Sequence, residues 1–166
     1  MNANLEISSE VLSTGAVRYT AASAITRETL YSRLPFSGPV VEKLAVSTVT
    51  IFGLGAGGSL LALQLARAGI GRLRLVDPAV IRAENVIRHV GGLESIDRLK
   101  VLVSSENVLR HNPYVVIDAY GIDPFNPESQ IDPEILFEGA DLIIAATDRV
   151  GAQLMINDYA WRLRVP

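Results

Sequence analysis

One stretch, residues 46–77, restricts the fold of this chain more than any other feature of its sequence. It begins with Thr48–Leu54, a short apolar run rich in β-branched residues, which is typical of a buried parallel strand. Ser59–Ala68 is apolar on nearly every side and predicts a helix that ends at a glycine, and Arg72–Val76 predicts a second strand. Glycines at the G-x-G-x-x-G spacing predict a tight turn between the first strand and the helix: Gly53, Gly55 and Gly58, with Gly57 as an extra member.

These glycines indicate a turn that binds phosphate. The first glycine allows the tight bend, the second lets the backbone approach a phosphate, and the third lets helix and strand pack closely. The helix N-terminus then offers free N–H groups and a favourable dipole to the anion. Asp77 follows nineteen residues after Gly58, about where an acid meets a ribose hydroxyl. We therefore predict a nucleotide site, with a purely structural glycine turn as the alternative.

Beyond this stretch the chain continues to alternate between helices and strands. The patterns predict helices over 95–111 and 149–163 and strands over 114–120 and 141–146. Such alternation favours an α/β fold, a Rossmann-like doubly wound sheet that is mainly parallel and has right-handed crossovers.

The chain divides into two parts by its sequence. Residues 1–26 are expected to be an N-terminal arm or linker, with short edge strands at the segments LEI and VRY. Residues 27–166 are expected to be the nucleotide-binding domain.

Composition excludes several classes of function. The net charge of −3 gives no global basic field, so no nucleic acid partner is expected. The sequence contains no apolar run long enough to cross a membrane and no basic–apolar signal pattern, and by default we expect a cytoplasmic protein. The absence of cysteine rules out disulfides, thiolate zinc sites and a cysteine nucleophile within this chain. Its mean hydropathy of +0.28 is high for a soluble protein and suggests an apolar subunit interface.

Polar residues recur where the predicted strands end, together with Asp77. Taken singly they have ordinary explanations: Asp148 as a helix cap, Lys100 as a solvated helix lysine, and Arg88 as a surface arginine. Ligands of open α/β sheets bind outside the carboxyl ends of the strands, where Asn85 and these three residues are expected. Two cations and an acid around a phosphate-binding turn suit a reaction at a triphosphate, in which developing charge is stabilised and a magnesium ion is held.

With these residues the chain resembles the adenylating domain of the ubiquitin-like-protein activating enzymes, the ThiF/MoeB superfamily. The resemblance runs from about Leu30 to the C-terminus, and His89 stands where the better-known members have glutamine. The motifs that carry it are YSR at Tyr31–Arg33, VTIFGLGAGGS at Val49–Ser59, ARAGIGRLRLVDPAVIRAENVIRH at Ala66–His89, the lysine of DRLKV, the HNP of His111–Pro113 and ADLIIAATD at Ala140–Asp148.

The resemblance implies an activity and a set of roles. Members of this family use ATP and Mg²⁺ to attach AMP to the C-terminal carboxylate of a small ubiquitin-like β-grasp protein. Arg33 would match the arginine that reaches into the partner subunit's site, which implies a homodimer. The remaining roles fall to the glycine turn for the phosphates, Asp77 for the ribose, Asn85, Arg88 and Lys100 for the triphosphate, and Asp148 for the magnesium ion.

The sequence departs from the family at its end. It stops where the family begins its next strand, before the regions that carry a catalytic cysteine and a zinc site in other members, so we expect a piece of a longer protein. Two alternative functions remain open: an NAD- or FAD-binding Rossmann oxidoreductase domain, and a non-catalytic dimerisation remnant. Outside the site, Asp118 and Asp123 are predicted to be acids without a partner, and Tyr159 and Trp161 to be packing or interface groups.

Overall fold

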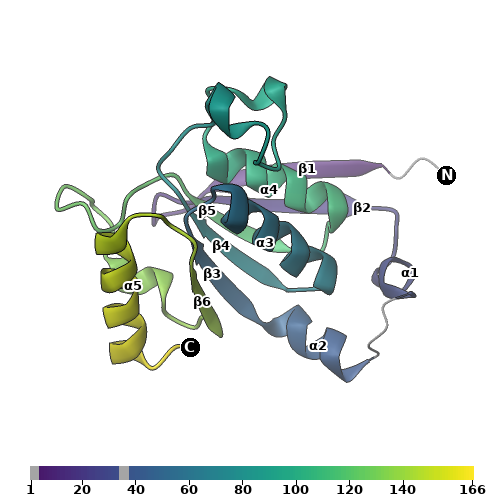
Figure 1. Ribbon diagram of the computed structural model, residues 1–166. Helices are drawn as coiled ribbons and strands as arrows, with labels where there is room; N and C mark the ends of the chain where they lie inside the picture. Colours follow the sequence, from purple (N-terminus) through teal and green to yellow (C-terminus); the bar gives the residue numbers. More distant parts are fainter. Residues whose placement is uncertain (1–3, 34–37) are drawn as a thin grey trace.

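The computed structural model describes residues 4–33 and 38–166. In that part of the chain a six-stranded sheet has the order β1-β2-β5-β4-β3-β6 (Figure 1). Four strands are parallel neighbours in the order β5-β4-β3-β6, so the chain builds outward from β3 in both directions and the doubly wound α/β prediction is confirmed. The strands are β1 (Leu5–Val11), β2 (Val17–Ser23), β3 (Thr48–Phe52), β4 (Arg72–Val76), β5 (Val116–Tyr120) and β6 (Leu142–Ala145).

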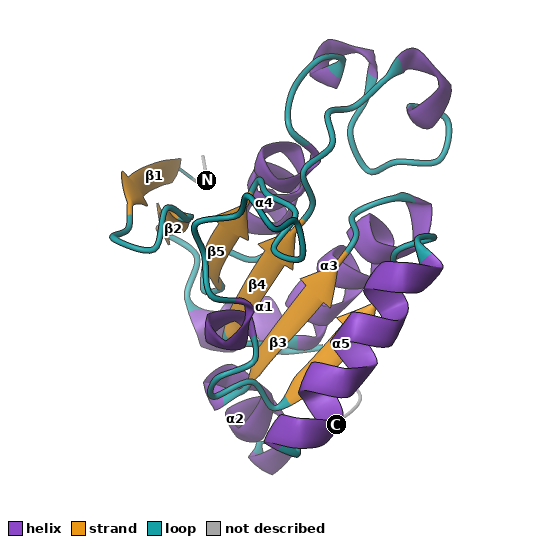
Figure 2. Cartoon of the chain, turned by 90° about the vertical axis from the view of Figure 1, so that its left-hand side faces the viewer, coloured by secondary structure: helices purple, strands orange, loops and turns teal. Residues whose placement is uncertain are grey.

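Helices lie on both faces of this sheet. Figure 2 shows α3 and α4 on one face and α5 on the other. Within the described ranges, no helix is both long and apolar enough to cross a membrane. The α-helices are α1 (Arg27–Tyr31), α2 (Pro39–Val46), α3 (Ala56–Ala68), α4 (Lys100–His111) and α5 (Val150–Leu163).

Alternation along the strands builds a separate core on each face. Val49 and Ile51 of β3 belong to the cluster formed with α3 and α4. Phe52, which points the other way, joins Phe137 and Tyr159 on the α5 face, with ring centroids 5.3 Å apart for Phe52–Phe137 and for Phe137–Tyr159. The predicted packing role of Tyr159 is therefore confirmed.

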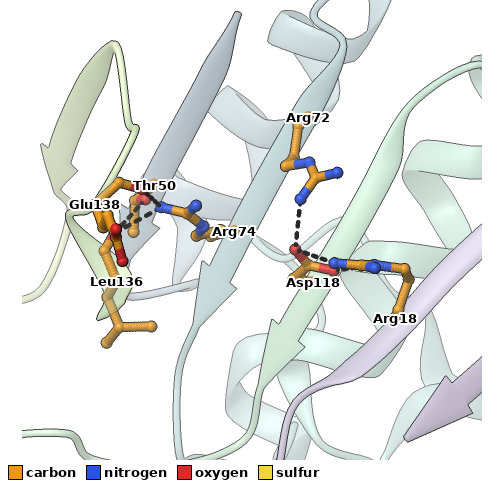
Figure 3. Close-up of polar contacts among 7 residues, drawn as sticks. All are labelled: Arg18, Thr50, Arg72, Arg74, Asp118, Leu136 and Glu138. Carbon is orange, nitrogen blue, oxygen red and sulfur yellow. Dashed lines mark hydrogen bonds and ion pairs between the residues drawn. The ribbon is translucent and has the colours of Figure 1, made fainter. Parts of the chain in front are cut away.

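The second face also carries a polar cluster that the sequence analysis missed. Asp118 on β5 is only 2% exposed and accepts hydrogen bonds from Arg18 at 2.7 and 3.1 Å and from Arg72 at 3.5 Å (Figure 3). Asp123 likewise pairs with Arg149. The prediction that these acids lack partners is wrong, because both partners are distant in sequence: Arg18 lies a hundred residues before Asp118, and Arg149 lies 26 residues after Asp123.

That N-terminal segment extends the sheet. β1 and β2 form an antiparallel hairpin, and β2 pairs antiparallel with β5. The VRY segment is therefore an internal strand and not an edge strand, whereas LEI does begin the strand at the edge.

Two helix starts differ from the prediction, and both differences shape the site. α3 begins at Ala56, inside the glycine turn, and not at Ser59. α4 begins at Lys100 and not at residue 95, because Leu93–Ser95 forms a separate 3-10 helix and Asp97 has a φ of 66°. The intervening residues are tied to the loop after β4 instead, through hydrogen bonds with Ile81.

Candidate functional site

The glycine turn joins β3 to α3 at the carboxyl edge of the sheet. Gly53 has a φ of 90°, and a Cβ there would lie 2.8 Å from the backbone nitrogen of Thr147. A Cβ on Gly58 would lie 1.9 Å from the carbonyl oxygen of Gly53. Gly55 and Gly57 differ, since a Cβ on either would meet no atom within 4 Å. Gly53 and Gly58 therefore serve close packing, and Gly55 and Gly57 leave open space beside the backbone.

Asp77 holds this turn in place from the end of β4. The side chain is buried, with 7% of the residue exposed. One carboxylate oxygen accepts from the N–H of Leu54 at 2.6 Å, and the other accepts from the N–H of Ala79 at 2.8 Å. Each oxygen keeps a further acceptor position. Asp77 thus fixes the turn and remains able to receive a hydroxyl from a ligand.

A cavity of about 380 Å³ opens beside the turn. It brings together seven of the residues predicted for the site from sequence; the predicted Gly57, Gly58 and Arg33 are not among those that line it. Four lining residues were not predicted: Ala56, His89, Ala146 and Thr147. The full lining is Gly53, Gly55, Ala56, Asp77, Asn85, Arg88, His89, Lys100, Ala146, Thr147 and Asp148.

Different elements supply the polar groups of this cavity. Asn85 ends a 3-10 helix and accepts from the N–H of Arg82 at 3.1 Å, which orients its side chain. Lys100 opens α4, where its own N–H donates to the carbonyl of Ala79 at 3.0 Å. Thr147 and Asp148 follow β6, directly before α5. Neither α3 nor α5 has a side-chain cap, so the N–H groups of both first turns are available to an anion.

His89 is a buried polar side chain of the loop between β4 and α4, with 8% of the residue exposed. Its Nδ1 accepts from the N–H of Gly91 at 2.9 Å. Burial lowers the pKa of His89; the Leu54 backbone raises it, the Lys100 charge lowers it and the Asp77 charge raises it. The ring is therefore neutral at physiological pH. The sequence signal for this residue was its place directly after Arg88, within the motif that carries the family resemblance.

A second, more apolar cavity of about 190 Å³ adjoins the first. The two share Gly53, Asp77, Lys100, Thr147 and Asp148. The further lining of the second is mostly apolar: Phe52, Val76, Pro78, Ala79, Ile122, Asp123, Pro124, Phe125, Arg149, Ala152 and Ile156. A cationic cavity joined to an apolar one can accommodate a phosphate chain and an aromatic base, respectively.

Arg33 lies away from this cavity in its own chain. Tyr31, two residues earlier, accepts a hydrogen bond from Asn112 at 2.6 Å, and its ring lies against Gly69. Both contacts are at the C-terminal ends of helices whose N-terminal ends border the cavity. Since α3 has 13 residues, it separates its two ends by about 20 Å. Arg33 therefore lies out of reach of the cavity of its own chain.

No group of three or more metal-binding side chains occurs in the residues that the structure describes. The exposed carboxylate of Asp148 is the acid at the mouth of the cavity that makes no hydrogen bond or ion pair within this part of the chain. One carboxylate with phosphate oxygens and water is a usual ligand set for Mg²⁺, which seldom occupies an all-protein cage. The residues present thus fit a magnesium ion that arrives with a nucleotide.

The ThiF family matches residues 28–166. The chain is 34% identical over 127 residues to the tRNA threonylcarbamoyladenosine dehydratase of Haemophilus influenzae, covering 75% of this chain and 47% of that protein. It is 32% identical over 129 residues to the sulfur carrier protein ThiS adenylyltransferase of Escherichia coli, covering 75% and 49%. The chain thus spans about half the length of these curated relatives.

The fold also matches a solved structure. The crystal structure of the E. coli tRNA N6-threonylcarbamoyladenosine dehydratase TcdA in complex with ATP superposes with a TM-score of 0.74 at 22% identity. The match covers 86% of this chain and 60% of that one.

Proposed function

This chain belongs to the ThiF family, and we propose that it is the nucleotide-binding part of an adenylyltransferase that acts on the C-terminal carboxylate of a ubiquitin-like β-grasp protein with ATP and Mg²⁺. The observation that carries the proposal is the lining of one cavity by the glycine turn, Arg88, Lys100 and Asp148. An oxidoreductase that binds a dinucleotide has little use for two cations and an unpaired acid beside the phosphate turn.

The chemistry requires alignment and charge stabilisation. A carboxylate oxygen of the acceptor protein forms a bond to the α-phosphorus of ATP. The bond from that phosphorus to the bridging oxygen breaks, and pyrophosphate leaves with the electron pair. The product is an acyl adenylate, a mixed anhydride of carboxylate and AMP. No protein nucleophile is needed, since binding aligns the reactants and cations neutralise the charge that develops on phosphate oxygens.

The geometry of the cavity supports a role for each of these residues. Gly55 and the first turn of α3 receive phosphate oxygens through backbone N–H groups, and Asp77 receives a ribose hydroxyl. Arg88 and Lys100 hold the triphosphate with Asn85 beside them, and the base enters the apolar cavity. Asp148 holds the magnesium ion, which supplies charge neutralisation to the phosphates when bound.

We further propose that the active form is a homodimer. Arg33 lies too far from the cavity of its own chain, so its role requires the cavity of a second copy. The outer side of α5 supports association: Val150, Leu154 and Trp161 recur at helical spacing, and Trp161 is 82% exposed. Ala152 and Ile156 of the same helix are buried on the side that faces the sheet.

The acceptor is proposed from chemistry as well as family. One relative is named for a tRNA nucleoside and another for a sulfur carrier protein. Because this chain has a net charge of −3, it lacks the global positive field that would attract tRNA, and a protein carboxylate is the better acceptor. A cytoplasmic location is part of the same proposal.

The test is ATP–pyrophosphate exchange in the full-length protein that contains this chain, with purified β-grasp proteins as acceptors. Exchange is expected only with Mg²⁺ and an acceptor that has a free C-terminal carboxylate, and Lys100→Ala should abolish it. Lys43→Ala, the other lysine of the chain, is the matched control and should exchange normally. NADH binding without ATP binding would instead favour the oxidoreductase alternative, and a stable dimer that binds no nucleotide would favour the non-catalytic one.

A further inference from the structure

The glycine turn is held by more than Asp77. Leu54, the residue between Gly53 and Gly55, gives its N–H to Asp77. His89 and the two glycines that flank Leu54 line the same cavity, and the Leu54 backbone raises the pKa of the imidazole. Glycines on both sides make this turn intrinsically flexible, so its bound conformation depends on side chains that hold Leu54.

The hydrogen bond at Nδ1 of His89 determines which ring nitrogen carries the proton. Nδ1 accepts from the N–H of Gly91, so in the neutral ring the proton resides on Nε2. Gly91 is itself fixed, because a Cβ there would lie 2.6 Å from Val103 Cγ1 and 3.0 Å from Ile81 Cδ1. The ring is thus anchored on a closely packed backbone segment.

The other ring nitrogen, Nε2, carries a hydrogen that it could donate to an acceptor. His89 Nε2 is buried and makes no hydrogen bond to any residue in the described ranges. A buried, unpaired N–H costs free energy, which a small adjustment of the nearby Leu54 carbonyl would recover. Hydrogen bonds of this kind are often long in a ligand-free site and shorten when ligand binds.

We propose that His89 is a positioning residue for the nucleotide site: as a neutral imidazole anchored on Gly91, it donates from Nε2 to the Leu54 carbonyl and holds the glycine turn in its phosphate-binding conformation. Asp77 and His89 then fix the N–H and the C=O of the same residue. The inference rests on the proposed nucleotide function and extends it to a residue to which that function gives no role.

If His89 holds the turn in this way, the nucleotide affinity of the site should fall in acid. A proton on Nδ1 would turn the acceptor into a donor facing the Gly91 N–H, and the anchor would be lost. The charged groups near the ring, Lys100 from α4 and Asp77 from the end of β4, have opposite effects on its pKa. Burial is the largest of these effects and lowers the pKa of His89, so the ring stays neutral down to pH values below 6.5, the ordinary pKa of histidine.

Two substitutions of His89 test the contributions of Nδ1 and Nε2 separately. Glutamine places a donor near the position of Nε2 and has no acceptor at that of Nδ1, whereas asparagine places an acceptor near Nδ1 and lacks the distal donor. His89→Gln should therefore keep its affinity for Mg-ATP within about twofold of the unsubstituted chain and melt at a lower temperature. His89→Asn should keep its melting temperature and lose about three- to tenfold in affinity, the value of one hydrogen bond.

The measurement is calorimetric titration with Mg-ATP from pH 5.5 to 8.0, with melting curves on the same samples. The ratio of the affinities of the unsubstituted chain and His89→Gln cancels the titration of ATP itself, and this ratio should fall at the acid end. Equal affinities in all three proteins, or losses of affinity that follow the losses of stability, would overturn the role of His89. If the unsubstituted chain binds no ATP, the proposed function itself fails and the inference with it.

Discussion

At the scale of single residues, the structural task of Asp77, which is to fix the glycine turn, can be measured without a ligand. Because Leu54 is fully buried, Asp77→Ala leaves the N–H of Leu54 without a hydrogen-bond partner. The N–H of Ala79, an exposed residue, can instead donate to water. We expect the free energy of unfolding to fall by about 1–3 kcal/mol. Asp148→Ala, at an exposed carboxylate of the same cavity, should change it by less than about 0.5 kcal/mol. Denaturant unfolding measures both, and equal losses in the two variants would contradict the assignment.

His89 gives stability a defined dependence on pH. Its pKa in the folded protein lies below the unfolded value of 6.5, so the unfolded chain binds the proton more readily. The stabilisation is fully present above 6.5 and is lost as the pH falls through the lower folded pKa. The slope of unfolding free energy against pH below 6.5 should therefore be shallower in His89→Gln. A slope unchanged in His89→Gln would refute this reading.

Most of the site at this scale was predictable, and the exceptions have a common cause. The spacing of Asp77, Asn85, Arg88, Lys100 and Asp148 relative to predicted strand ends was sufficient to bring them to one cavity. The hydrogen bonds from Leu54 and Gly91 were not predictable, because they depend on the backbone path of turns, which hydrophobic periodicity does not encode. His89 was missed as a functional residue for that reason.

At the scale of elements, the packing of α3 against the glycine turn depends on Gly58. A Cβ at this position would lie 1.9 Å from a backbone oxygen, so Gly58→Ala must displace α3 from β3. We expect a loss of about 1–3 kcal/mol of stability. Gly57→Ala has open space and should leave the melting temperature unchanged or raise it, since alanine favours the helix. Equal melting temperatures for the two variants would contradict the close packing.

Sequence patterns located the parallel strands well and the hairpin poorly. Each parallel strand is bounded by turn signals and followed by a helical segment, so local information suffices. The N-terminal hairpin gains its place from β2 pairing with β5 and from Arg18 bonding to Asp118, across about a hundred residues. Such long-range pairing has no local signature, and the acid therefore seemed to lack a partner.

At the scale of the whole molecule, the separation of Arg33 from its own cavity predicts complementation between chains. In the full-length protein, Arg33→Ala and Asp148→Ala should each abolish exchange. A mixed dimer of the two holds one intact site, with Asp148 from one chain and Arg33 from the other. Mixing equal amounts after dissociation should restore roughly a quarter of normal exchange. No recovery, despite proven mixed dimers, would show that Arg33 has no role in the partner's site.

The central claim is that the cavity binds ATP together with magnesium. Calorimetric titration of the chain with ATP, with and without Mg²⁺ and alongside NADH, tests it most directly. We predict that the chain binds ATP, that Mg²⁺ strengthens this binding, and that NADH gives no heat. Lys100→Ala should weaken ATP binding, and Lys43→Ala should leave it unchanged. NADH binding that ignores Mg²⁺, or ATP binding indifferent to both Mg²⁺ and Lys100, would contradict the claim.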